Sequence, residues 1–199
     1  LDAENTDKET ALLIAVKNRH SAAVEVLVSA GADVNVCDKQ ENTPLLAAVD
    51  ANLVDMVRSL LAAGASAFDT NAAGDTPLKC ALTKQHMEVV RVLVDVQDDY
   101  GNTALLLAAQ WGDADAVRAL LAANASTGVA NKDGKTALQL ALTNDHKAVV
   151  QLLGNIADSE DNSAVAMAAQ KGEIDLLKKL IASKAAVNSH NAQGLTPLM

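Results

Sequence analysis

The sequence Thr43-Pro44-Leu45-Leu46-Ala47-Ala48 is followed 33 residues later by Thr76-Pro77-Leu78-Lys79-Cys80-Ala81. The same short phrase, Thr or Ser followed by Ala or Pro and then an aliphatic residue, recurs at intervals of 33 or 27 residues. We call its first residue the anchor of a repeat; the anchors are Thr10, Thr43, Thr76, Thr103, Thr136, Ser163 and Thr196. Each of the first six anchors is followed at a distance of five residues by an alanine: Ala15, Ala48, Ala81, Ala108, Ala141 and Ala168. A fixed register of this kind predicts a protein built from stacked repeats.

Each repeat carries the signals of two short helices. The anchor hydroxyl is suited to cap the first helix, and Pro44 and Pro77 occupy the first helical position, where proline is tolerated. After a turn, apolar residues return at helical spacing, as in Val117, Leu120 and Leu121. We expect the second helix to end at a residue with the left-handed backbone conformation, and these residues are Gly31, Gly64, Asn124 and Lys184. Lysine suits that backbone conformation poorly, so the last of these positions is a departure.

A 33-residue period, a Thr-Pro-Leu start, two short helices and the tail Gly31-Ala32-Asp33-Val34-Asn35 resemble the ankyrin repeat. The resemblance covers nearly the whole chain. It implies an all-α solenoid of stacked helix-turn-helix repeats with short β-hairpin fingers, two of them shortened. We expect a single solenoid over residues 1–199, with six units starting near residues 5, 38, 71, 98, 131 and 158 and a partial seventh unit over 191–199. Because that seventh unit lacks a second helix, we expect the chain to be a fragment of a longer protein.

The chain departs from the family pattern in three ways. The third and fifth units have only 27 residues, so we expect stunted or missing hairpins there without a break in the helical stacking. The fingertips carry Asp or Asn followed by Gly three residues later in four fingers, but Glu41 and Asp161 replace that glycine, and we expect those two turns to differ in shape. The family has a histidine at the fourth motif position, and we expect the hydrogen bonds that it makes between units to be absent here. The residues at this position are Leu13, Leu46, Lys79, Leu106, Gln139 and Ala166.

Composition excludes several classes of function. The net charge is −9, with 16 basic and 25 acidic residues, which disfavours binding to nucleic acid or to an anionic membrane surface. No apolar run is long enough for membrane insertion. Two cysteines, Cys37 and Cys80, form no disulfide framework and favour a reducing, intracellular location, either cytoplasmic or nuclear.

The sequence offers little for catalysis. It has no nucleotide-binding glycine motif and no nucleophile motif, and no two histidines fall at a metal-ligand spacing. His20, His86 and His146 share one repeat position, ten residues after the anchor, which indicates a structural role at the start of the second helix. We expect Cys80 to lie in the core and Cys37 to be exposed in a finger. The sequence therefore predicts a non-enzymatic protein with no cofactor, no metal and no small-molecule substrate.

The remaining candidate for function is the surface. The resemblance implies binding through the fingertips and the concave face of the first helices. The only tryptophan, Trp111, lies at the exposed end of a first helix, and the only tyrosine, Tyr100, lies at the fingertip of the same unit. Both residue types are enriched at binding hot spots, although Trp111 could instead fold over its repeat as a cover. The predicted partner-binding residues are Tyr100, Trp111, Lys84, Asp99, Gln110, Lys132, Asp133 and Asn144.

These features favour a module that binds a protein or peptide of unknown identity through its concave face and fingertips. Two alternatives stay open: an inhibitory ankyrin protein that sterically blocks an enzyme or transcription factor, and a targeting domain of a larger enzyme. A modification is also possible, because Asn35 and Asn188 follow leucines by eight residues, which resembles the ankyrin pattern attacked by asparaginyl hydroxylases.

Overall fold

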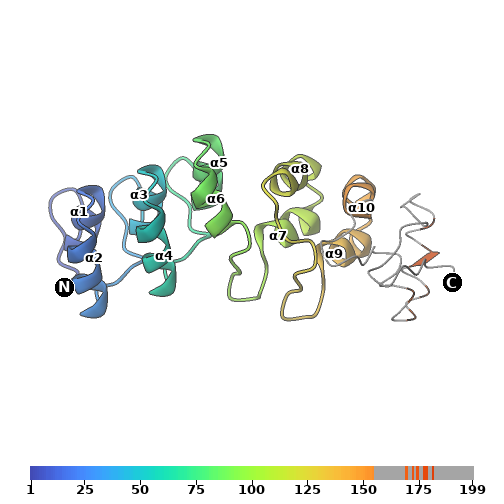
Figure 1. Cartoon of the computed structure of the whole chain (residues 1–199), viewed down its shortest axis with the longest axis horizontal. Coiled ribbons are helices and arrows are strands. Elements are labelled where there is room, and N and C mark those ends of the chain that lie inside the picture. Colours follow the sequence, from blue (N-terminus) through green and yellow to red (C-terminus); the bar gives the residue numbers. More distant parts are fainter. Residues whose placement is uncertain (155–168, 170–171, 173, 175–176, 179–180, 182–199) are drawn as a thin grey trace. The chain divides into compact units, whose positions relative to one another are not determined.

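Helices in the described part of the chain come in pairs, one pair for each of the first five anchors (Figure 1). The computed structural model describes residues 1–154, 169, 172, 174, 177–178 and 181. The first helices of the pairs are α1 (Ala11–Lys17), α3 (Pro44–Asp50), α5 (Pro77–Thr83), α7 (Ala104–Trp111) and α9 (Ala137–Thr143). The second helices are α2 (Ser21–Ser29), α4 (Val54–Ala62), α6 (Met87–Leu93), α8 (Ala114–Ala122) and α10 (Lys147–Gly154).

The chain divides into two compact units, Leu1–Asp98 and Asp99–Met199. In the first unit each helix packs on its own partner, α1 contacts α3, α3 contacts α5, and the second helices α2, α4 and α6 contact one another in the same order. In the second unit α7 packs on α8 and α9, and α10 packs on α8 and α9. Each unit is thus a stack of helix-turn-helix repeats, as predicted; one continuous solenoid over residues 1–199 stays a prediction.

The anchor hydroxyls cap the first helices. The side-chain oxygen of Thr43 accepts a hydrogen bond from the Leu46 N–H at 3.2 Å, and the anchors of the other four described pairs bond at 3.2–3.4 Å in the same way. Each cap satisfies one of the N–H groups that have no partner inside the helix. Pro44 and Pro77 occupy the first helical positions, as the sequence predicts.

Alanine at one repeat position lets neighbouring helix pairs approach closely. The alanines five residues after the anchors are buried in every described pair: Ala15, Ala48, Ala81, Ala108 and Ala141. Around them lie buried leucines and valines such as Leu45, Val57 and Leu105. The core is therefore built from small and branched aliphatic side chains.

The second helices end in left-handed residues at three of the four predicted positions. Gly31 has φ +84°, Gly64 has φ +90° and Asn124 has φ +62°. The fourth, Lys184, lies outside the described residues.

The first 27-residue unit keeps its helix pair, α5 and α6, and the second keeps α9 and α10. The prediction that a 27-residue unit keeps its helix pair is therefore confirmed. Stacking across the short connection after α6, which joins the two compact units, stays a prediction. The short connection after α6 still carries a fingertip turn, with Gly101 at φ +78°. The second short connection, near Asp158, lies outside the described residues.

The fingers are tight turns closed by an Asn or Asp side chain. Oδ1 of Asn71 accepts hydrogen bonds from the Ala73 and Asp75 N–H groups, both at 3.0 Å, and Asn5, Asp38 and Asn131 bond in the same pattern. These short local bonds hold the fingers although the described residues contain no strand, only a β-bridge between Ala130 and Thr136.

Glu41 does not change the shape of its turn, contrary to the expectation from the sequence. It adopts φ +59°, and its N–H donates to the Asp38 carbonyl at 2.9 Å, as the Gly74 N–H donates to the Asn71 carbonyl at 2.8 Å. The two Asp38 side-chain bonds hold the turn strongly enough for a non-glycine residue to take the left-handed conformation.

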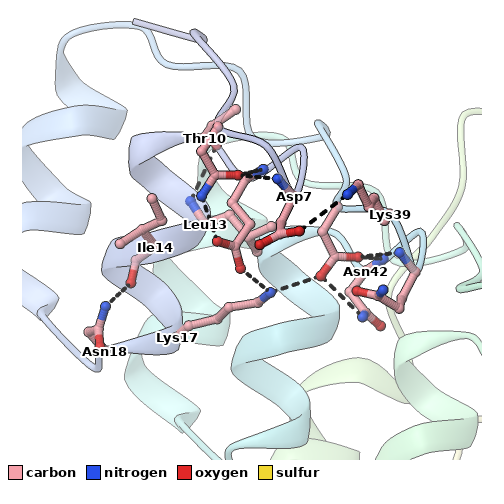
Figure 2. A network of polar contacts seen from close by, with 12 residues as sticks. Asp7, Thr10, Leu13, Ile14, Lys17, Asn18, Lys39 and Asn42 are labelled. Atoms are coloured by element: carbon pink, nitrogen blue, oxygen red, sulfur yellow. Dashed lines mark hydrogen bonds and ion pairs between the residues drawn. The ribbon is translucent and has the colours of Figure 1, made fainter.

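An ion-pair network ties the first two fingers to α1 (Figure 2). Nζ of Lys17 donates to Oε1 of Glu9 at 2.7 Å and to Oδ2 of Asp38 at 2.9 Å, and the Asp38 side chain is only 1% exposed. Burial raises the pKa of Asp38, but hydrogen bonds from Lys17 and Asn42 outweigh it and hold the pKa below its usual 3.8. The Lys17 hydrogen bond likewise lowers the pKa of Glu9.

Truncation of a core leucine should destabilise the stack. Leu120 in α8 is 5% exposed, so Leu120→Ala leaves a cavity and is expected to lower the free energy of unfolding by about 2–5 kcal/mol, measured by urea denaturation. Val26→Ala in α2 is the control, because Val26 is 69% exposed, and should change stability by less than about 0.5 kcal/mol. Equal effects of the two substitutions would show that Leu120 is not in the core.

Acid should weaken the Asp38 network. Because the folded-state pKa of Asp38 lies below its unfolded value, its contribution is complete above about pH 5 and is lost as the pH falls through the folded value. Asp38→Asn removes the charge but keeps an oxygen for the backbone bonds, so it should cost about 1–2 kcal/mol at pH 7 and less near pH 3. Asp115→Asn, at an exposed carboxylate, is the control for urea titrations at both pH values. A cost that does not change with pH would contradict the role of the Asp38 charge.

Candidate functional site

Trp111 is the last residue of α7 and is 71% exposed. The helix begins at the Thr103 cap and ends because Gly112 turns left-handed at φ +77°. Leu105, Leu106, Ala108 and Ala109 point into the core and fix the helix, whereas Gln110 and Trp111 lie at its exposed end. The aromatic ring of Trp111 is thus exposed to solvent at the end of a helix whose opposite side is buried in the core.

Tyr100 lies at a fingertip and is 74% exposed. Its backbone carbonyl accepts a hydrogen bond from the Lys132 N–H of the next finger at 3.0 Å. That finger is closed by Asn131, whose Oδ1 accepts from the Asp133 N–H at 3.1 Å and whose Nδ2 donates to Oδ1 of Asn102 at 3.1 Å. These two described fingers are therefore hydrogen-bonded side by side.

The predicted residues of the second unit fall into two groups. The fingertip group consists of Asp99, Tyr100, Lys132 and Asp133, and the helix-end group consists of Gln110, Trp111 and Asn144; all seven residues are exposed. The eight residues of α7 separate the two ends of the repeat by about 12 Å at 1.5 Å per residue. The two aromatic side chains thus mark opposite ends of one repeat rather than one cluster.

Lys84, the eighth predicted residue, belongs to the unit Leu1–Asp98. Its ammonium group forms an ion pair with Asp50 at the end of α3, and the hydrogen bond to Asp50 raises the pKa of Lys84. Lys84 is exposed, and it also ties its own repeat to the preceding one.

Two histidines link neighbouring repeats. The carbonyls of His86 and His146 accept the first backbone bond of α6 and α10, which confirms their place at the helix start. Their side chains reach back to the preceding repeat: the His86 ring contacts the Val49 carbonyl at 3.0 Å, and the His146 ring contacts the Gln110 carbonyl at 2.9 Å. Histidine bonds between repeats therefore exist, although not from the position that the family uses.

Two residues that the sequence does not predict as binding residues, His146 and Gly112, lie against the helix-end group. The His146 ring contacts the Gln110 carbonyl and occupies the space that Gly112 leaves beside Trp111. The signal in the sequence was the shared repeat position of His86 and His146. It could not show which residue each ring would reach.

The cysteines differ from the expectations. Cys37 is half-buried rather than exposed, and Cys80 is half-buried rather than in the core. Sγ of Cys80 lies 3.7 Å from Oδ1 of Asp50, and burial, followed by the Asp50 charge, raises the pKa of the Cys80 thiol. A raised pKa disfavours the thiolate and thus a nucleophilic role.

Asn35 has a structural contact of its own. Its Oδ1 accepts a hydrogen bond from the Ser66 N–H at 2.9 Å, and its Nδ2 donates to the Gly64 carbonyl at 3.3 Å. The side chain therefore bridges to the loop of the following repeat. Its hydroxylation stays a hypothesis, and Asn188 lies outside the described residues.

The described residues lack the features of two other kinds of site. None of the helices there is long and apolar enough to cross a membrane. In the same part of the chain no three His, Cys, Asp or Glu residues gather in a way that could hold a metal ion.

The repeat geometry agrees with a comparison against known protein families. A family model described as ankyrin repeats (3 copies) matches the chain three times, over residues 1–71, 63–129 and 94–162. Ankyrin repeats are generally modules for protein–protein interaction and typically carry no enzymatic activity. The matches span well over half of the sequence, and the chain belongs to the ankyrin-repeat family.

Proposed function

We propose that this chain is a non-enzymatic protein-recognition module that binds its partner along one repeat of the second unit, from the Tyr100 fingertip to the Trp111 helix end. The observation that carries the proposal is the exposure of these two rings, 74% and 71%. The chain has one Trp, one Tyr and one Phe, so both large polar-tipped aromatic side chains lie on the surface of the same repeat.

Exposure of the Trp111 ring has a thermodynamic cost that the fold does not require. The core of α7 is complete without it, because Leu105, Leu106 and Ala109 are buried. The 71% exposure also counts against the interpretation of Trp111 as a cover over its repeat. Tryptophan and tyrosine dominate binding hot spots because a rigid, partly polar ring buries a large area for little entropy loss.

The polar rim around the two rings indicates the kind of partner. Asp99 and Asp133 carry negative charge and Lys132 carries positive charge, while Gln110 and Asn144 are neutral. This mixture suits a folded protein or a peptide that makes apolar contacts with the rings and polar contacts at the rim, and it lacks the clustered basic residues that nucleic acid requires.

Two finer functions fit the same surface. The module could inhibit an enzyme or a transcription factor by covering it, or it could target an attached enzyme to its substrate. An activity assay on the captured partner separates inhibition from scaffolding, and the full reading frame decides whether an enzyme is attached.

The test is affinity capture from cell lysate with the wild type and with Tyr100→Ala/Trp111→Ala. Loss of a hot-spot aromatic typically costs about 2 kcal/mol, so the double variant should bind the captured partner at least about 30-fold more weakly. Val26→Ala/Met87→Ala is the matched control, because it truncates two exposed apolar residues of the first unit. All proteins must share the wild-type melting temperature. Capture that survives in the double variant would contradict the proposed binding surface.

A further inference from the structure

A 33-residue repeat is followed by a 27-residue repeat at two places in the described chain, between α3 and α5 and between α7 and α9. We call these places the first and the second junction; they differ in the residue that stands at one position of the backbone. Nine residues after the anchor the chain turns left-handed, and this residue is Asn52 (φ +56°) at the first junction and Gly112 (φ +77°) at the second. The histidine of the next repeat contacts the preceding carbonyls through Nδ1 at the first junction and through Nε2 at the second. The rings therefore sit differently at equivalent places.

Gly112 provides the space for the second arrangement. A Cβ at this position would lie 2.5 Å from Nδ1 of His146, 2.7 Å from its Cγ and 2.8 Å from its Cε1. The His146 ring thus occupies the place where any other residue would put its side chain. At the first junction Asn52 has a Cβ, and the His86 ring bonds to a carbonyl one repeat position earlier, that of Val49.

The Gln110 carbonyl receives two donors from the next repeat. Nε2 of His146 lies 2.9 Å from it and Nδ2 of Asn144 lies 3.2 Å from it. The last carbonyls of a helix have no partner inside the helix, so these bonds fix the final turn of α7 from outside. The α7 helix also runs to the eighth residue after its anchor, whereas α1, α3, α5 and α9 end at the seventh.

Trp111 lies between these two constraints. The carbonyl before it is held by Asn144 and His146, and the glycine after it is covered by the His146 ring. Helix α9 packs on α7, and α10, which follows His146, packs on α8 and α9, so the rest of the next repeat supports the contact (Figure 1). An exposed ring can present one orientation to a partner only if its own backbone does not move.

We propose that His146 is a positioning residue, which uses the space left by Gly112 to hold the last turn of α7 and thereby present Trp111 to the partner. The role in recognition rests on the proposed function, but the effect of His146 on the last turn of α7 can be measured without a partner. Trp111 is the only tryptophan of the chain, so its fluorescence reports on this turn alone.

The experiment uses the purified full chain and time-resolved fluorescence anisotropy of Trp111. His146→Ala and Gly112→Asn should each raise the amplitude of the fast motion of the Trp111 ring about twofold. His146→Ala removes the hydrogen bond to the Gln110 carbonyl, and Gly112→Asn displaces the His146 ring. Hydrogen exchange at the Gly112 and Asp113 amides, which close the last turn on Ala108, should speed up selectively relative to α8. His146→Gln keeps a side-chain N–H donor and should restore most of the wild-type behaviour.

Matched controls come from the first junction and from the double variant. His86→Ala and Asn52→Gly change the equivalent residues and should leave Trp111 motion unchanged. In Gly112→Asn/His146→Ala the ring that the new side chain would meet is absent, so the effect should be smaller than the sum of the two single effects. If His146→Ala fails to fold, His146→Leu replaces it, because leucine fills part of the volume of the ring but has no donor for the Gln110 carbonyl. If Gly112→Asn fails to fold, Gly112→Ala replaces it, because a Cβ alone already meets the His146 ring.

The outcomes separate this inference from the proposed function. Unchanged Trp111 motion in both single variants, or strictly additive effects, would overturn the positioning role even if Trp111→Ala abolishes capture. Looser Trp111 motion supports positioning, and an accompanying loss of about tenfold in partner affinity for His146→Ala at unchanged melting temperature links it to recognition. Looser motion with undiminished capture by Trp111→Ala would support positioning while contradicting the proposed function.

Discussion

Stacking of one helix pair on the next is the interaction on which the rest of this structure depends. The described helices have seven to nine residues, too few to be stable alone in water. Each pair therefore has to bury its apolar side against a neighbour, and the small alanine five residues after each anchor permits that close contact, as at Ala48 and Ala141. Removal of one interface would expose leucines and valines on both sides of it.

The fingers do not share this dependence on apolar burial. In four of the described fingers one Asn or Asp side chain accepts two backbone N–H groups, and neighbouring fingers are joined by backbone bonds such as that from the Ala72 N–H to the Gln40 carbonyl at 3.0 Å. Side-chain bonds of this kind stabilise the left-handed residue that follows. This explains why Glu41 and Lys8 adopt the conformation that Gly74 adopts. A loop held by its first residue tolerates variation at the others.

The features that could be predicted from the sequence are those that depend on local chemistry or on a strict period. Threonine caps, left-handed ends at Gly31 and Asn124 and the survival of the short repeats all follow from residues close together in the chain. What could not be predicted depends on the reach of side chains between repeats. The rings of His86 and His146 cross to carbonyls 37 and 36 residues away, and the half-burial of Cys80 results from packing beside Asp50.

The candidate site shows the same division. The exposure of Tyr100 and Trp111 agrees with their repeat positions, because in the described repeats the equivalent fingertip residues are exposed and the equivalent helix-end residues are exposed or half-buried. Their grouping into one binding surface stays a prediction, because α7 separates the two ends of the repeat by about 12 Å and Lys84 is paired with Asp50 in the other unit.

Equivalent positions in the two junctions show how a repeat protein gives one backbone different surfaces. At the first junction the helix end carries Asp50 and Ala51, with Lys84 paired to the carboxylate; at the second it carries Gln110 and Trp111, with Asn144 bonded to a backbone carbonyl. An exposed ion pair adds little stability, and a partner that packs on it has to desolvate both charges, whereas the Gln110 carbonyl is uncharged and already accepts two hydrogen bonds from within the chain. An apolar contact with the last turn of α7 therefore leaves this carbonyl paired, while an apolar contact with the last turn of α3 covers the Lys84–Asp50 ion pair. The sequence places its only tryptophan at the second of these junctions.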